Sequence, residues 1–95
     1  MTKKIAKYKI KALVKQLGVN TDVVSLNTLQ IGIKIEMEHG LQLPKTNVTD
    51  DSTLKTLKIV LAHLDEYPDY YERLIKMEKQ ADTYWKHKIK PSIWK

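Results

Sequence analysis

The sequence of 95 residues contains no cysteine, no phenylalanine, and only three glycines and three prolines. The lack of cysteine excludes disulfide frameworks, thiolate nucleophiles and metal sites with cysteine ligands. Apolar runs are only a few residues long, which excludes a membrane-spanning helix. The lysine-rich start lacks the apolar stretch of a secretory signal, so the chain is expected to stay inside the cell. The three glycines are far apart, which excludes a glycine-rich phosphate loop.

The net charge of +6 is unevenly distributed along the chain. Residues 1–18 contain six lysines and no acid, and residues 84–95 contain four lysines and no acid. All eleven acidic residues lie in the acidic middle, residues 19–83. Basic ends attract polyanions and acidic protein surfaces, although lysines also serve simply to solvate a helix face. The candidate polyanion-binding residues of the first basic end are Lys3, Lys4, Lys7, Lys11 and Lys15.

The spacing of apolar residues predicts an all-α fold, a small compact bundle of about four helices. A chain of this length has room for one core, so we expect a single helical domain at residues 1–85 and a basic aromatic tail at 86–95. Four amphipathic segments are predicted as helices, at residues 4–17, 27–39, 52–66 and 68–89.

Several residues carry helix-end signals. Gly18 follows the first helix, where a left-handed cap favours glycine. The pair Asn27 and Gln30 is predicted to cap the second helix, which Gly40 is predicted to end. Pro68 is expected in the first turn of the fourth helix, where its missing N–H costs little.

The segment from Leu29 to Met37 is ambiguous, because apolar and polar residues alternate as they do in a strand. A strand needs a partner, and no second alternating segment exists in the sequence. As a helix, the segment has Leu29, Ile33 and Met37 on one side and Ile31 and Ile35 on another. We therefore predict a central helix that is buried from two directions.

Two histidine–carboxylate pairs have a spacing of three residues, Glu36 with His39 and His63 with Glu66. Helical bundles use carboxylates and histidines at this spacing to hold iron or manganese, so the four residues form a candidate metal site. The second pair runs in the reverse order, and ion pairs or a helix-end contact explain the same residues more simply.

Three elements between Gly32 and Glu78 form a longer pattern. They are Glu-x-Glu-His-Gly from Glu36, Thr-Asn-Val-Thr from Thr46, and Lys-Ile-Val-Leu-Ala-His-Leu-Asp-Glu-Tyr-Pro-Asp-Tyr-Tyr-Glu-Arg-Leu from Lys58. With them the chain resembles an uncharacterised family of small proteins from bacteria, phages and large DNA viruses. The resemblance implies a compact helical fold and a viral or bacterial setting, but no activity.

The tail interleaves aromatic and cationic residues, which suits docking into a protein groove or against phosphates. A frayed chain end is the alternative interpretation. Tyr70 and Tyr71 are interpreted as core and hydrogen-bonding residues rather than a stacking platform for bases. The candidate partner-docking residues are Trp85, Lys86, Lys88, Lys90, Ile93 and Trp94.

Together these observations predict a non-enzymatic structural or accessory protein of a phage or large virus, in the cytoplasm or the virion. It would need no cofactor and no membrane, and it would dock through its basic ends onto a protein partner in a larger assembly, for example a capsid or virion protein. The serines do not lie on strained turns, which disfavours a hydrolase. The alternatives are a metal-binding helical protein with a His/Glu site and a non-specific nucleic-acid-binding protein.

Overall fold

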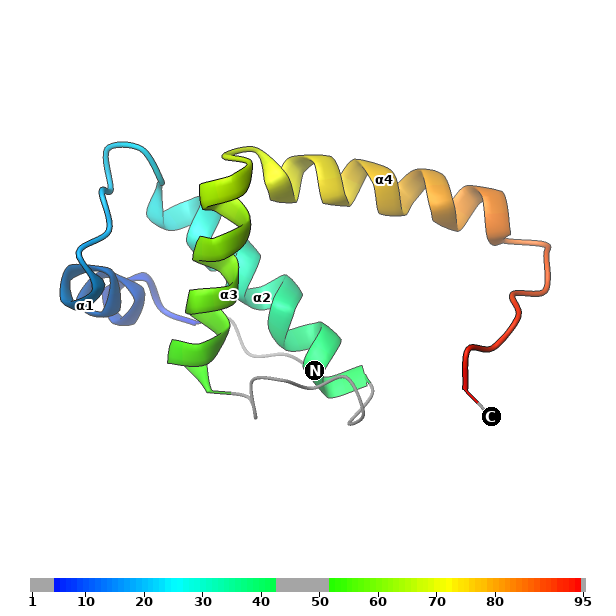
Figure 1. The fold of residues 1–95 in the computed structure, drawn as a ribbon, viewed down its shortest axis with the longest axis horizontal. Helices are drawn as coiled ribbons and strands as arrows, with labels where there is room; N and C mark the ends of the chain where they lie inside the picture. The colour runs from blue at the N-terminus through cyan, green and yellow to red at the C-terminus, as the bar shows by residue number, and fades with distance from the viewer. Residues whose placement is uncertain (1–4, 43–51, 95) are drawn as a thin grey trace.

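The computed structural model describes residues 5–42 and 52–94, with the side chains of 39–42 outside the description. These residues form four helices and contain no strand, which confirms the all-α prediction (Figure 1). Within this part of the chain, no helix combines the length and apolar character needed to span a membrane. The helices are α1 (Lys7–Leu17), α2 (Leu26–Gln42), α3 (Thr53–Glu66) and α4 (Tyr70–Trp85).

Helix α1 packs Ile10 and Val14 into the core and ends at the predicted glycine. Gly18 has φ 75° and ψ 32°, the left-handed conformation that a side chain disfavours. Its N–H donates to the Lys15 carbonyl, and the next N–H, from Val19, donates to the Val14 carbonyl at 3.0 Å. This is the Schellman pattern, which satisfies the last carbonyls of the helix.

The start of α2 differs from the prediction. The cap is Ser25, whose hydroxyl oxygen accepts the Thr28 N–H at 3.1 Å, rather than Asn27. A serine hydroxyl three residues ahead of an N–H is a common N-terminal cap. Gln30 has a different role: its side-chain amide donates to the Ile5 carbonyl at 2.7 Å and ties the segment before α1 to α2.

The ambiguous segment is helical, and Leu29, Ile33 and Met37 lie in the buried core. Leu29 and Ile33 have no exposed surface and Met37 is buried, whereas Ile31 is 41% exposed. Helix α2 contacts α1, α3 and α4, so apolar residues are needed on more than one side of it. It also continues through Gly40 to Gln42, past the predicted end, because glycine permits a left-handed cap but does not impose one.

Helix α3 is capped by Ser52, whose hydroxyl oxygen accepts the Lys55 N–H. Its buried face includes Thr56 beside Leu57, Val60 and Leu64. Thr56 is tolerated there because its hydroxyl donates to the Ser52 carbonyl at 2.7 Å. The buried face of α3 is therefore wider than the spacing of its apolar residues indicates, because it also includes Thr56.

Helix α4 begins later and ends earlier than predicted. Pro68 and Asp69 form a turn before it, and the Asp69 carboxylate binds Arg73 Nε at 2.7 Å. The helix ends at Trp85 instead of residue 89, because its last turns are exposed and have no core contact to stabilise them. Pro91 also disfavours helical geometry in the residue before it.

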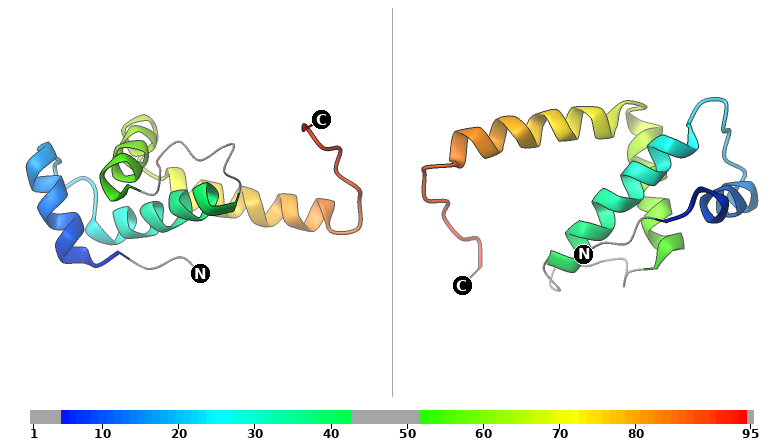
Figure 2. Two further views of the ribbon diagram at one scale, coloured as in Figure 1. Left: turned by 90° about the horizontal axis from the view of Figure 1, so that it is seen from below. Right: turned by 180° about the vertical axis from the view of Figure 1, so that it is seen from behind.

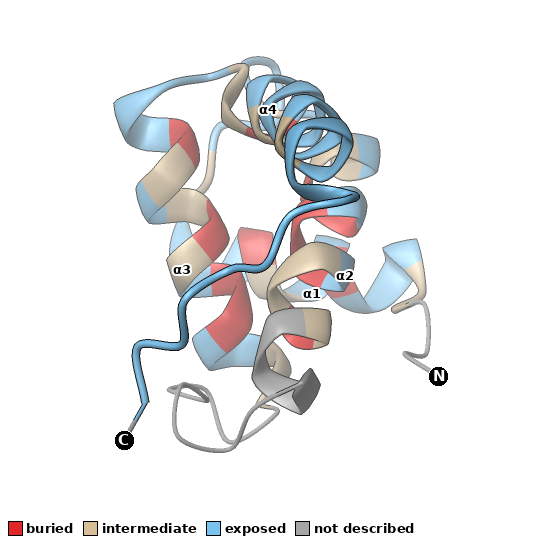
Figure 3. Ribbon diagram, turned by 90° about the vertical axis from the view of Figure 1, so that its right-hand side faces the viewer, coloured by how far each residue is buried: buried red, intermediate tan, exposed pale blue. Residues whose placement is uncertain are grey.

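Three helices and the first turn of α4 enclose the core, and the rest of α4 projects away from it (Figures 1 and 2). Figure 3 shows the buried positions concentrated on α1, α2 and α3, whereas α4 is exposed along most of its length. The projecting helix lengthens the molecule to 45 × 25 × 23 Å. The buried apolar residues are Ile10, Val14, Leu29, Ile33, Met37, Leu57, Val60, Leu64 and Tyr71.

Candidate functional site

A polar cluster of Glu36, His63, Tyr70 and Tyr71 forms where α2, α3 and α4 meet. The Tyr71 hydroxyl donates a hydrogen bond to Glu36 Oε1 at 3.1 Å, and His63 Nδ1 lies 3.1 Å from the same hydroxyl oxygen. His63 Nδ1 is also 3.5 Å from Glu36 Oε1. The imidazole stacks on the Tyr70 ring with 4.1 Å between centroids. The cluster thus links three helices through side chains.

The position of the cluster follows from Gly32 and Glu36, which are four residues apart and therefore on the same face of α2. The Tyr71 ring lies against Gly32 so closely that a Cβ there would be 2.8 Å from Tyr71 Cε2. With the ring over the glycine, the hydroxyl at its far end reaches the carboxylate one turn further along α2. The turn at Pro68 brings Tyr71 back over the last turns of α3.

Both phenols of the cluster keep their protons at neutral pH. Burial is the main cause that raises the pKa of Tyr71 far above its usual value, and the negative charge of Glu36 and its hydrogen bond add to the shift. Burial also raises the pKa of Tyr70, followed by the charges of Glu36, Glu66 and Glu78. The Tyr71 ring is 2% exposed, so its hydroxyl acts as a donor inside the fold.

Of the four predicted metal ligands, the structure brings Glu36 and His63 together. Glu66 is exposed at the end of α3, and the His39 side chain lies outside the described residues. Among the side chains that the structure describes, no group of three or more histidines and carboxylates is close enough to hold a metal ion. The metal site stays a prediction, with two of its residues in contact and a tyrosine beside them.

The predicted docking residues all lie in one exposed segment, residues 84–94, which we call the arm. Its aliphatic side chains are the most exposed large apolar groups of the described chain, Ile89 at 96% and Ile93 at 85%. The ammonium of Lys88 lies 3.2 Å from the Tyr84 ring centroid, and the Tyr84 ring packs edge-on against Trp85. The other predicted docking residues, Lys86, Lys90 and Trp94, are exposed on the same segment.

The predicted polyanion-binding lysines form a separate surface. Lys7, Lys11 and Lys15 are exposed on α1, while Lys3 and Lys4 lie outside the described residues. Helix α1 is at one end of the molecule and the arm at the other (Figures 1 and 2). The two basic ends of the sequence therefore do not combine into one continuous basic face.

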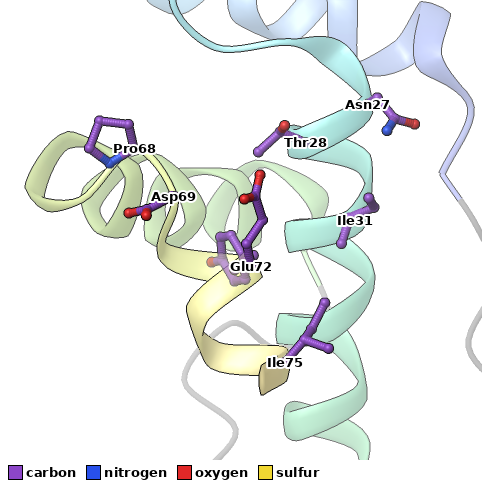
Figure 4. Close-up of a pocket in the computed structure, with 8 residues that line it drawn as sticks. Asn27, Thr28, Ile31, Pro68, Asp69, Glu72 and Ile75 are labelled. Atoms are coloured by element: carbon purple, nitrogen blue, oxygen red, sulfur yellow. The ribbon is translucent and has the colours of Figure 1, made fainter. Parts of the chain in front are cut away.

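The hollows on the surface of the body include a pocket beside α4 and a groove beside α3. A pocket of about 130 Å³ separates the start of α2 from the start of α4, with Thr28, Ile31, Glu72 and Ile75 among its lining residues (Figure 4). A larger groove of about 550 Å³, which we call the valine groove, lies between the loop 18–25 and α3. Its apolar lining is Val19, Val23, Val24, Leu61, Ala62, Leu64 and Pro68.

The valine groove is a feature that the sequence analysis missed. Residues 19–24 contain Asn20, Thr21 and Asp22, which indicate a turn, and the turn is observed. The missed signal is the presence of three valines in so short a connection, since valine favours packed surfaces. Val24 is partly buried against the core, but Val23 is 68% exposed.

The fold and its sites define a small all-α protein with a three-helix core, a polar cluster at the base of α4 and an exposed basic aromatic arm. The chain belongs to a family of proteins of unknown function, DUF5661, which matches residues 10–80. This membership confirms the resemblance to an uncharacterised family, and the matched region stops before the arm. Comparison with curated proteins found no match, and comparison with solved structures found none either.

Proposed function

We propose that this protein is a non-enzymatic structural or accessory protein, which joins a larger assembly by docking its arm onto a protein surface. The observation that carries the proposal is the exposure of Ile89 and Ile93, on a segment that also presents Trp94 and several lysines. Exposed apolar side chains that gather in one place and alternate with cations mark interaction sites more than solvated surface.

The side chains of the arm favour a protein partner over a nucleic acid. Lysines and aromatic rings suit either partner, because phosphates attract the former and bases stack on the latter. The aliphatic side chains of Ile89 and Ile93 gain free energy only where an apolar surface covers them. The partner surface that fits is therefore an apolar groove with acidic residues at its rim.

The body supplies a firm base for the arm. Tyr71 anchors the first turn of α4 in the core, and the polar cluster joins that turn to α2 and α3. Tyr84, where the arm begins, is thirteen residues after Tyr71 in α4, so the helix carries the arm about 20 Å from its anchor. We propose, from the family resemblance, that the assembly is a capsid or virion of a phage or large virus, or a cytoplasmic complex of its host.

The proposal is tested by photo-crosslinking in the native host. A photoreactive residue replaces Ile93, and a matched control carries the same residue at Thr83, which is exposed on α4 outside the arm. We expect protein adducts from position 93, at least about tenfold more abundant than from position 83 and lost on adding excess unlabelled chain. Adducts exclusively with nucleic acid, or equal labelling from both positions, would contradict a protein-docking role.

Non-specific nucleic-acid binding is the second candidate, and the exposed lysines of α1 favour it. If nucleic-acid binding is only a side effect of the exposed lysines, a DNA duplex should bind only at low salt. The reason is that the logarithm of the binding constant falls with the logarithm of the salt concentration, with a slope of about −0.9 for each neutralised phosphate. We expect the affinity to fall at least roughly 100-fold between 50 and 200 mM salt. Replacing Lys7, Lys11 and Lys15 by glutamine should abolish the binding that is seen at low salt. A filter-binding titration would measure this loss. Tight binding that persists at 200 mM salt would favour the nucleic-acid function instead.

A further inference from the structure

We infer that the arm of one molecule docks into the valine groove of a second molecule, so that copies of this chain join head to tail. This inference rests on the proposed function and names a second copy of the chain as the protein that the arm binds.

The groove has the size and the lining that the apolar side chains of the arm need. Its volume of about 550 Å³ is several times that of the pocket beside α4. A hollow of this size is within the range of about 300–1,000 Å³ typical of binding pockets. Val23, Leu61 and Ala62 present apolar surface to it, which would cover Ile89 and Ile93 of the incoming arm.

Charge favours the same pairing. The groove lies along the last two turns of α3, where the negative end of the helix dipole attracts cations. The charged residues that line the groove are Asp65 and Lys58, and Glu66, which is exposed, follows Asp65 at the end of α3. The arm carries lysines and no acid, so its cations can pair with Asp65 and Glu66 at the carboxyl end of this helix.

The fold sets the arm and the groove apart. The loop 18–25, which forms one wall of the groove, is at the end of the molecule opposite the tail (Figures 1 and 2). In the structure residues 86–94 are all exposed and extend from the far end of α4, away from loop 18–25 (Figure 1). The arm and the groove are thus both open, and the groove of a neighbour can take the arm without any rearrangement of the fold. Such a contact joins two different surfaces, so it leaves one arm and one groove open and can propagate.

Two substitutions test the contact, one in the arm and the other in the groove. Ile93→Asp removes an apolar group from the arm, and Ala62→Arg fills the groove from an exposed position on α3. Both positions are exposed, so the fold should tolerate the changes. Thr83→Asp and Ala12→Arg introduce the same side chains at exposed positions elsewhere and serve as matched controls.

Sedimentation equilibrium of the full chain reads out the result. We expect the wild type and both controls to rise above monomer mass between roughly 10 µM and 1 mM, since a contact of this size is weak. Each disabled variant alone should stay monomeric, with association at least about tenfold weaker. An equimolar mixture of the two should form dimers and stop there, because one intact arm meets one intact groove.

Failure of this inference is distinguishable from failure of the proposed function. A wild type that stays monomeric throughout, or a mixture no heavier than its components, overturns head-to-tail docking. If position 93 then crosslinks to a different protein, the docking role of the arm stands without self-assembly. If position 93 labels no protein at all, both proposals are overturned.

Discussion

Replacing Gly32 by alanine should destabilise the protein by about 1–3 kcal/mol, although alanine is the better helix former by about 1 kcal/mol. A Cβ at this position would lie 2.8 Å from Tyr71 Cε2 and 2.8 Å from Val60 Cγ1. Both neighbours are buried, so neither can move without opening space elsewhere in a close-packed core. The loss of free energy of unfolding would be measured by urea denaturation followed by circular dichroism.

Two further variants isolate the close approach as the cause. Lys34→Ala, at an exposed position of the same helix, should change the free energy of unfolding by less than about 0.5 kcal/mol. In a Val60→Ala background one of the two clashes is absent, so Gly32→Ala should be less harmful there by about 1 kcal/mol. A Gly32→Ala variant more stable than the wild type would show that α4 and α3 do not approach α2 so closely.

The alternating pattern at 29–37 shows what the sequence can decide about the fold. The absence of a second alternating segment favoured a helix, and the helix is observed. The reason for the alternation is three-dimensional. Because α2 contacts α1, α3 and α4, successive apolar residues meet different neighbours: Ile33 lies in the core, while Ile31 borders the pocket with Ile75.

Helix ends were less predictable than helices, because neighbouring residues compete for the same role. Ser25 and Asn27 are both good caps, and Ser25 prevails at the start of α2. Asp69 is well placed to cap α4, but its carboxylate binds Arg73 instead. Capping propensity says which residues make good helix caps, but it does not decide which of the neighbouring candidates makes the capping hydrogen bond.

The candidate site was half predictable. Spacing placed Glu36 and His63 on helices that could meet, and they lie 3.5 Å apart. The position of the Tyr71 hydroxyl, 3.1 Å from both of them, depends on the direction in which α4 leaves α3. That direction follows from the turn at Pro68 and the missing side chain at Gly32, which act together only in the folded chain.

The second large effect concerns the Tyr71 hydroxyl, which Tyr71→Phe removes while keeping the ring. At neutral pH the variant should lose about 1–2 kcal/mol, because Glu36 loses a donor in a partly buried position. A double-mutant cycle with Glu36→Ala, which removes the acceptor, would measure the coupling between the two side chains, which we expect to be about 1 kcal/mol. Additive losses would show that the 3.1 Å contact contributes nothing to stability.

The same variant should reverse the order of stability in alkaline solution. Burial raises the pKa of Tyr71 in the folded state above that of an unfolded tyrosine, about 10. Above that pH the unfolded chain releases the phenolic proton and the folded chain retains it, so stability falls as pH rises. The contribution is fully present below pH about 10 and is lost, by up to about 1.4 kcal/mol per pH unit, toward the folded pKa.

Tyr71→Phe has no such proton to lose, and the other side chains are the same in both proteins, so the difference between the two reports mainly on the Tyr71 phenol. The wild type should therefore be the more stable at pH 7, and the two curves of unfolding free energy against pH should cross near about pH 11. Urea denaturation at intervals from pH 7 to 11.5 would locate the crossing. Parallel curves would mean that the phenol ionises as readily in the folded chain as in the unfolded one. The hydroxyl would then not be held beside Glu36 and His63, and the packing of the Tyr71 ring alone would fix the direction of α4 and of the arm.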